Sequence, residues 1–178
     1  MINEITAPIM NDSFDATENA MLSNDDVIST LNGLIETCKD GQEGFKESAE
    51  SVTDSNLKTG FYEFSQQRAQ FVGELQTLVR ELGGDPENSG SISGAIHRGW
   101  IDLKAMVTGK DDAAILNEAE RGEDVAKGYY KDASEKNLPA NVLSVVNKQY
   151  QAIQSAHDQV KQWRDSANHE NSSATTGY

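Results

Sequence analysis

The stretch LKTGFYEFSQQRAQFVGELQTLVRELGG, residues 57–84, decides the fold class of this chain. Its large apolar residues follow one another in steps that fit a helix: Leu57, Phe61, Phe64, Phe71, Leu75, Leu78 and Leu82. This spacing places them on one face of an α-helix, whereas a half-buried strand would alternate at every second residue. Gly83-Gly84 and then Pro86 form a normal helix stop signal. The stretch therefore predicts a long amphipathic helix that needs other helices to cover its apolar face.

Three further segments show helical periodicity. The first begins near Ser23 or Asn24, either of which can cap it, and reaches about residue 52. Another starts near Asp111 and ends at SEKNLP, residues 134–139. The last begins at Pro139, which suits the first turn of a helix. Because no run of residues alternates as a strand would, the sequence predicts an all-α protein.

A long connection, from residue 83 to about 110, separates the second and third predicted helices. Its centre, ISGAIHRGWIDLKAMV, would place Ile92, Ile96, Trp100, Leu103 and Val107 on one helical face. We therefore predict a short amphipathic helix inside the crossover between helices 2 and 3. Two helical hairpins joined by such a crossover form the ferritin-like four-helix bundle. A single extended coiled coil is the main alternative, and the predicted turns at 53–56 and 134–139 argue against it.

Both ends of the chain lack a periodic apolar face. We predict a flexible N-terminal arm over residues 1–22, a bundle over 23–166 and a disordered C-terminal tail over 167–178. The start of the chain lacks a basic cluster and a long apolar run, and no segment approaches a membrane span. These features lead us to expect a cytoplasmic protein.

The composition restricts the partners. The formal net charge is -14, which disfavours nucleic acid and anionic membranes because both require basic patches. We interpret the acidity as a solvated surface and expect self-association or contact with another protein. The single cysteine, Cys38, excludes an internal disulfide and any cysteine-based metal cluster. It falls on the apolar stripe of the first helix, which predicts a small buried side chain.

The motif Gln154-x-x-His157 differs by one residue from the Glu-x-x-His half-site of di-iron bundles. Such a site also needs inward carboxylates on all four helices. At 100° per residue, however, Gln154, Glu63 and Glu120 point outward, and His157 lies on the flank of its helix. Glu123 and His157 are the remaining candidate metal ligands. We predict no metal, no other cofactor and no catalytic residue.

Each predicted long helix has one polar residue on its apolar stripe near its middle: Gln42, Arg68, Glu123 and Gln149. The guanidinium of Arg68 stays charged, so it would repel a metal dication and compete for the Glu123 carboxylate. An Arg68–Glu123 pair with two amides would complete a polar layer without metal. Alternatively, Arg68 extends its charged end to solvent and the layer is partly wet.

The predicted crossover contains another cluster of candidate residues, His97, Arg98 and Trp100. They could line a pocket, although a capping or surface position for His97 is the simpler interpretation.

Five blocks of the sequence occur in an order that resembles a known family: LIETCKDGQEGFKESAE, FSQQRAQFVGELQTLVRELGG, GAIHRGWIDLKA, NEAERGEDVAKGYYKDA and QYQAIQSAHDQVKQWRD. Together they resemble a bacterial family of ferritin-like four-helix-bundle proteins that is known as a domain of unknown function. The resemblance covers about residues 24–166. It implies the bundle fold and a bacterial source but supplies no activity and no accepted catalytic residues.

Two functional interpretations follow. The first is a soluble, non-enzymatic bundle that acts through assembly or protein contacts; the link to stress survival rests only on ferritin-like kinship. The alternative is a metal-binding or oxidative-stress protein of the ferritin and rubrerythrin type with a degenerate di-iron site. The number of inward carboxylates separates them, because the sequence predicts one where a standard site has four.

Overall fold

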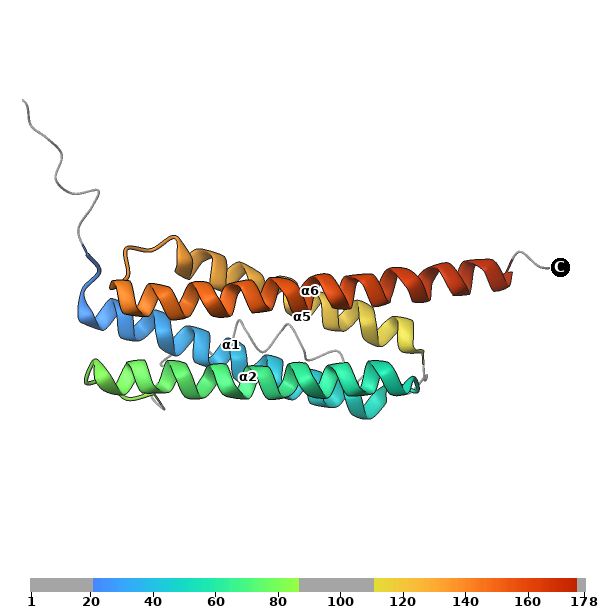
Figure 1. Cartoon of the computed structure of the whole chain (residues 1–178), viewed down its shortest axis with the longest axis horizontal. Helices are drawn as coiled ribbons and strands as arrows, with labels where there is room; N and C mark the ends of the chain where they lie inside the picture. Colours follow the sequence, from blue (N-terminus) through green and yellow to red (C-terminus); the bar gives the residue numbers. More distant parts are fainter. Residues whose placement is uncertain (1–20, 87–110, 176–178) are drawn as a thin grey trace, which may run out of the picture.

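The computed structural model describes residues 21–86 and 111–175, which form four α-helices and no strand (Figure 1). The helices are α1 (Asn24–Ser51), α2 (Ser55–Glu81), α5 (Asp112–Ser134) and α6 (Ala140–Thr175). Within these ranges, no helix is long and apolar enough to cross a membrane. The predicted crossover helix, with His97, Arg98 and Trp100, lies outside the described residues, as do residues 1–20 of the predicted arm.

Side-chain caps explain where three of the helices begin. Ser23 accepts a hydrogen bond from the amide of Asp26, Asp54 caps α2, and Asp111 caps α5. These caps satisfy amides that have no partner inside their own helix. Beyond the end of α2, Gly83 adopts a φ of 80°, which favours glycine. The predicted helix starts and the stop after α2 agree with these positions.

The helices form two hairpins, α1–α2 and α5–α6, which lie side by side (Figure 1). Between the hairpins, α1 packs against α5 more extensively than α2 packs against α6. The carboxylate of Asp112 accepts hydrogen bonds from the amides of Thr53, at 2.8 Å, and Asp54, at 3.0 Å. These bonds attach the start of α5 to the turn between α1 and α2.

Two apolar clusters fill the interior. The larger one lies toward the α5–α6 turn and includes Leu31, Ile35, Leu75, Val142 and Val146. The second lies toward the α1–α2 turn and contains Phe45, Ala49, Val52, Phe61, Ile115, Leu116, Ala119 and Val160. Polar side chains are buried where the clusters meet, at the middle of the bundle.

The two ends of the bundle differ from the sequence prediction. Helix α6 continues to Thr175, so residues 167–175 are helical where we expected a disordered tail. Its C-terminal part extends beyond the ends of the other helices (Figure 1). The first turn of this extension is attached to the bundle, because Ala167 packs against the second apolar cluster. At the other end, Leu22 packs on the larger cluster and its amide donates to the carbonyl of Asn137 at 3.2 Å.

Two glycines of α2 provide a test of the packing near the second cluster. A Cβ on Gly60 would lie 2.4 Å from the ring of Trp163, whereas a Cβ on Gly73 would meet nothing within 4 Å. We expect Gly60→Ala to destabilise the fold by about 1–3 kcal/mol because the packed ring must move. Gly73→Ala should stabilise it by about 0.5–1 kcal/mol through helix propensity. Urea unfolding of both variants measures the difference, and equal stabilisation would contradict the contact between Gly60 and Trp163.

Candidate functional site: a buried polar layer

The centre of the layer is an ion pair between α2 and α5. The Arg68 guanidinium donates to the Glu123 carboxylate with 2.5 Å between Nη2 and Oε2. The side chains are 1% and 0% exposed, so both charges are removed from water. Removing one partner of such a pair would leave the other charge buried and uncompensated.

Aromatic rings and a glycine shape the space around Arg68. The guanidinium carbon lies 5.6 Å from the centre of the Phe45 ring and 5.7 Å from that of Phe71. Both distances suit a cation–π interaction. On α1, a Cβ at Gly41 would lie 3.5 Å from Cγ of Arg68, so the aliphatic part of Arg68 packs over this glycine. Outside the ion pair, Nη1 of Arg68 donates to Oε1 of Gln67 at 2.8 Å.

A second buried network links four residues of different helices. Cys38 Sγ lies 3.0 Å from the hydroxyl of Tyr130, which donates to Oε1 of Gln149 at 2.7 Å. The amide of Gln149 donates to Oε2 of Glu74 at 2.8 Å. This chain of hydrogen bonds runs from a fully buried thiol to a carboxylate near the surface.

The structure brings three of the four predicted layer residues into the middle of the bundle: Arg68, Glu123 and Gln149 are all buried. The predicted inward position of Gln42 is wrong, because its side chain is half-buried. What Gln42 contributes is its backbone carbonyl, which accepts from the hydroxyl of Ser65 at 2.8 Å. On α1 the position nearest Arg68 is the preceding residue, Gly41, where a Cβ would lie in ordinary contact with the side chain of Arg68.

The ion pair leaves two polar atoms without a hydrogen-bond partner among the described residues: Oε1 of Glu123 and Nε of Arg68. Burial raises the pKa of the Glu123 carboxyl above its ordinary value, while the charge of Arg68 acts in the opposite direction. The stability of the layer therefore depends on pH through Glu123, since the guanidinium keeps its charge.

The other network contains two weak acids that are kept neutral. Burial raises the pKa of the Cys38 thiol to about 11, although Arg68 lowers it somewhat. Burial also raises the pKa of Tyr130 well above its ordinary value. A thiol in this state is a poor nucleophile and a poor metal ligand, because both roles require the thiolate.

Two further predictions about charged residues are corrected. Glu120, expected to point outward, is 8% exposed and forms an ion pair with Arg164 of α6. His157, expected on the flank, is 6% exposed. Its Nε2 lies 3.0 Å from the Asp124 carboxylate and its Nδ1 lies 3.0 Å from that of Asp158. Contacts across the α5–α6 interface bury both residues, and the periodicity of one helix does not contain that information.

Of the residues proposed to point away from a metal site, Glu63 is exposed and Gln154 is half-buried. In the described part of the chain, no group of three or more histidine, cysteine, aspartate or glutamate side chains is arranged to hold a metal ion. The carboxylate of Glu123 is fully buried at mid-bundle, and the guanidinium of Arg68 already binds one of its two oxygens. These donors do not fit a di-iron centre, which needs several inward carboxylates and histidines.

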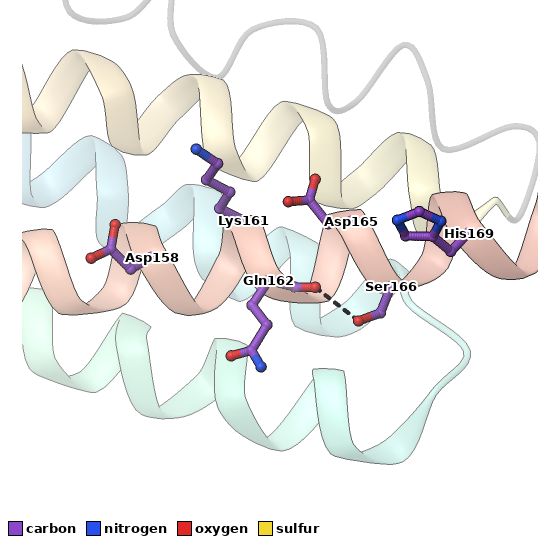
Figure 2. A pocket seen from close by; sticks show the side chains of 6 residues that line it. All are labelled: Asp158, Lys161, Gln162, Asp165, Ser166 and His169. Atoms are coloured by element: carbon purple, nitrogen blue, oxygen red, sulfur yellow. Dashed lines mark hydrogen bonds between the residues drawn. The ribbon is translucent and has the colours of Figure 1, made fainter.

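A hollow on the surface of α6 is a weaker candidate for a binding site. A shallow hollow is lined by six side chains that all belong to α6: Asp158, Lys161, Gln162, Asp165, Ser166 and His169 (Figure 2). The bond drawn there joins the hydroxyl of Ser166 to the carbonyl of Gln162, within one helix. Exposed side chains of a single helix do not enclose a ligand.

Comparisons with known proteins agree with the geometry. The chain is similar to a solved two-domain protein from Anabaena variabilis that contains DJ-1/ThiJ/PfpI-like and ferritin-like domains. The TM-score is 0.68 at 17% sequence identity, over 83% of this chain and 41% of that one. This similarity confirms the predicted class, a ferritin-like four-helix bundle.

The family follows from the sequence match. Residues 26–136 match the family described as a domain of unknown function (DUF2383), and the chain belongs to this family. The match ends before α6, which supplies Gln149 and His157. No curated protein matches the chain.

Proposed function

We propose that this protein acts through contacts with another protein, on a bundle whose centre is held by its own ion pair instead of a metal cluster. The fully buried pair of Arg68 and Glu123 between two apolar clusters supports the metal-free centre, and it thereby favours a role through contacts over metal chemistry. The guanidinium supplies the positive charge that a metal would otherwise supply to Glu123. Because this charge cannot be removed by deprotonation, a dication at the same place would be repelled.

The neighbouring network supports the same interpretation. Cys38 and Tyr130 are neutral, and Gln149 is engaged through both its oxygen and its nitrogen. Of the carboxylates near the layer, Glu123 is paired with Arg68, Glu120 is paired with Arg164 and Glu74 accepts from Gln149 near the surface. One free oxygen on Glu123 cannot balance the charge of two metal ions. The alternative, a ferritin- or rubrerythrin-type protein with a degenerate site, is less well supported by this set of donors. Cytoplasmic location and a role in stress survival remain expectations from the sequence.

Metal analysis tests the proposal. We expect protein purified without chelator to contain far less than one iron, manganese or zinc ion per chain, and to lack ferrous oxidase activity. The physical reason is the repulsion by Arg68 and the small number of free carboxylate oxygens, since Glu123 and Glu120 are each paired with an arginine. Elemental analysis after incubation with ferrous iron provides the measurement, and Glu123→Gln is the matched variant. About two ions per chain that are lost in Glu123→Gln would overturn the proposal.

A further inference from the structure

We infer that the groove between α2 and α6 is a docking site for an apolar helix of a basic partner protein; the inference rests on the proposed function. The groove has a volume of about 470 Å³. It lies on the side of the bundle where the hairpins meet through α2 and α6, which pack less closely than α1 and α5 do. Groups that line it come from both helices.

The walls of the groove have helical spacing. Its lining residues are Gly60, Glu63, Phe64 and Gln67 of α2, and Ala152, Ser155, Ala156, Gln159 and Trp163 of α6. Both sets follow the steps i, i+3, i+4 and i+7, which extend a strip along each helix axis. A third helix that lies along such a strip can insert its own side chains at the same intervals.

The floor is apolar and the sides are polar. The rings of Phe64 and Trp163 lie 5.8 Å apart and are half-buried. Gly60 keeps the floor low, because a side chain there would meet the ring of Trp163. Small side chains at Ala152 and Ala156 leave room for a leucine- or phenylalanine-sized group from outside. At the rim, the amide nitrogen of Gln67 can donate a hydrogen bond and the amide oxygen of Gln159 can accept one.

The charge of the groove and of the chain favours a different protein over a second copy of this chain as the occupant of the groove. Glu63 is the one charged residue among the nine that line the groove, and it is exposed. A second copy would bring another Glu63 and a further net charge of -14, which opposes association. A partner helix with apolar side chains on one face and lysine or arginine beside them has the complementary charge.

A synthetic amphipathic helix is a suitable probe. Its leucines would occupy one face at steps of three and four residues, with lysines on the other face; a second peptide carries glutamates in place of the lysines. We expect the leucine–lysine peptide to bind the full chain, and Ser155→Arg to weaken this binding at least about tenfold by filling the groove. Ser144→Arg, also exposed on α6 but outside the groove, has the same charge and should bind like the wild type.

Titration calorimetry with both peptides, and sedimentation of the chain alone, give the outcomes. Equal binding to Ser155→Arg and Ser144→Arg would overturn the groove as the site, because only general charge attraction would remain. Equal binding of the glutamate peptide would overturn the basic partner. A wild-type dimer that Ser155→Arg dissociates would replace the partner by a second copy. None of these results depends on the metal content, so the failure of this inference and that of the metal-free core are distinguishable.

Discussion

Arg68→Met is expected to make the free energy of unfolding fall as the pH rises above about 4.5, the ordinary pKa of a glutamate. In the wild type, Arg68 partly offsets the effect of burial on Glu123. Without the guanidinium, the strongest influence that opposes burial is lost, so the pKa of Glu123 rises further and the folded chain keeps this proton at pH values where the unfolded chain releases it. A group whose pKa is raised in the folded state stabilises the fold at low pH and loses this contribution as the pH rises.

The expected loss is large. Each pH unit between the ordinary pKa of a glutamate and the raised pKa of Glu123 removes about 1.4 kcal/mol. Urea unfolding at several pH values between 4 and 7 measures it. Arg80→Met is the matched control, because Arg80 lies on the same helix and is exposed. If the free energy of unfolding of both variants responds to pH in the same way, the pKa of Glu123 does not depend on Arg68.

The second large effect concerns Cys38 at alkaline pH. The pKa of its thiol rises from the ordinary 9.0 to about 11 in the folded chain. Above pH 9 the unfolded chain therefore loses this proton first, and the folded state is destabilised by up to about 1.4 kcal/mol per pH unit, or roughly 2 kcal/mol at pH 11. Tyr130, whose pKa is also raised, acts in the same direction.

Cys38→Ala isolates the contribution of the thiol. The variant keeps the lysines and tyrosines that also titrate, so the difference between its unfolding curve and that of the wild type reports Cys38. We expect this difference to be constant below pH 8 and to shrink between pH 9 and 11. A constant difference up to pH 11 would mean that the thiol is not held in its neutral form by burial.

Much of the fold could be predicted because its signals are local. Asp54 and Asp111 cap helices that begin directly after them, and Gly83 takes the positive φ that ends α2. The inward positions of Arg68 and Glu123 also follow from spacing within one helix. The end of α6 was missed because residues after Ala167 have no apolar stripe, although the structure continues the helix.

The errors in the site have a common cause, which is contact between different helices. Gln42 is half-buried, and Arg68 packs on α1 over the neighbouring Gly41 instead. Glu120 is buried because Arg164, on another helix, neutralises its charge. The hydroxyl of Tyr130 was not assigned to the layer, since a tyrosine on an apolar stripe is also a normal core residue. A helical wheel describes one helix and does not contain these partners.

A double-mutant cycle at pH 7 tests most directly whether Arg68 and Glu123 hold the centre of the bundle as a pair. The cycle compares Arg68→Met, Glu123→Gln and the double variant by urea unfolding. We expect the double variant to recover most of the stability that Arg68→Met loses, with a coupling free energy of about 2–3 kcal/mol that falls toward zero near pH 4, where Glu123 is protonated. Additive effects, within about 0.5 kcal/mol at pH 7, would show that the two charges do not stabilise each other and would contradict the proposed metal-free core.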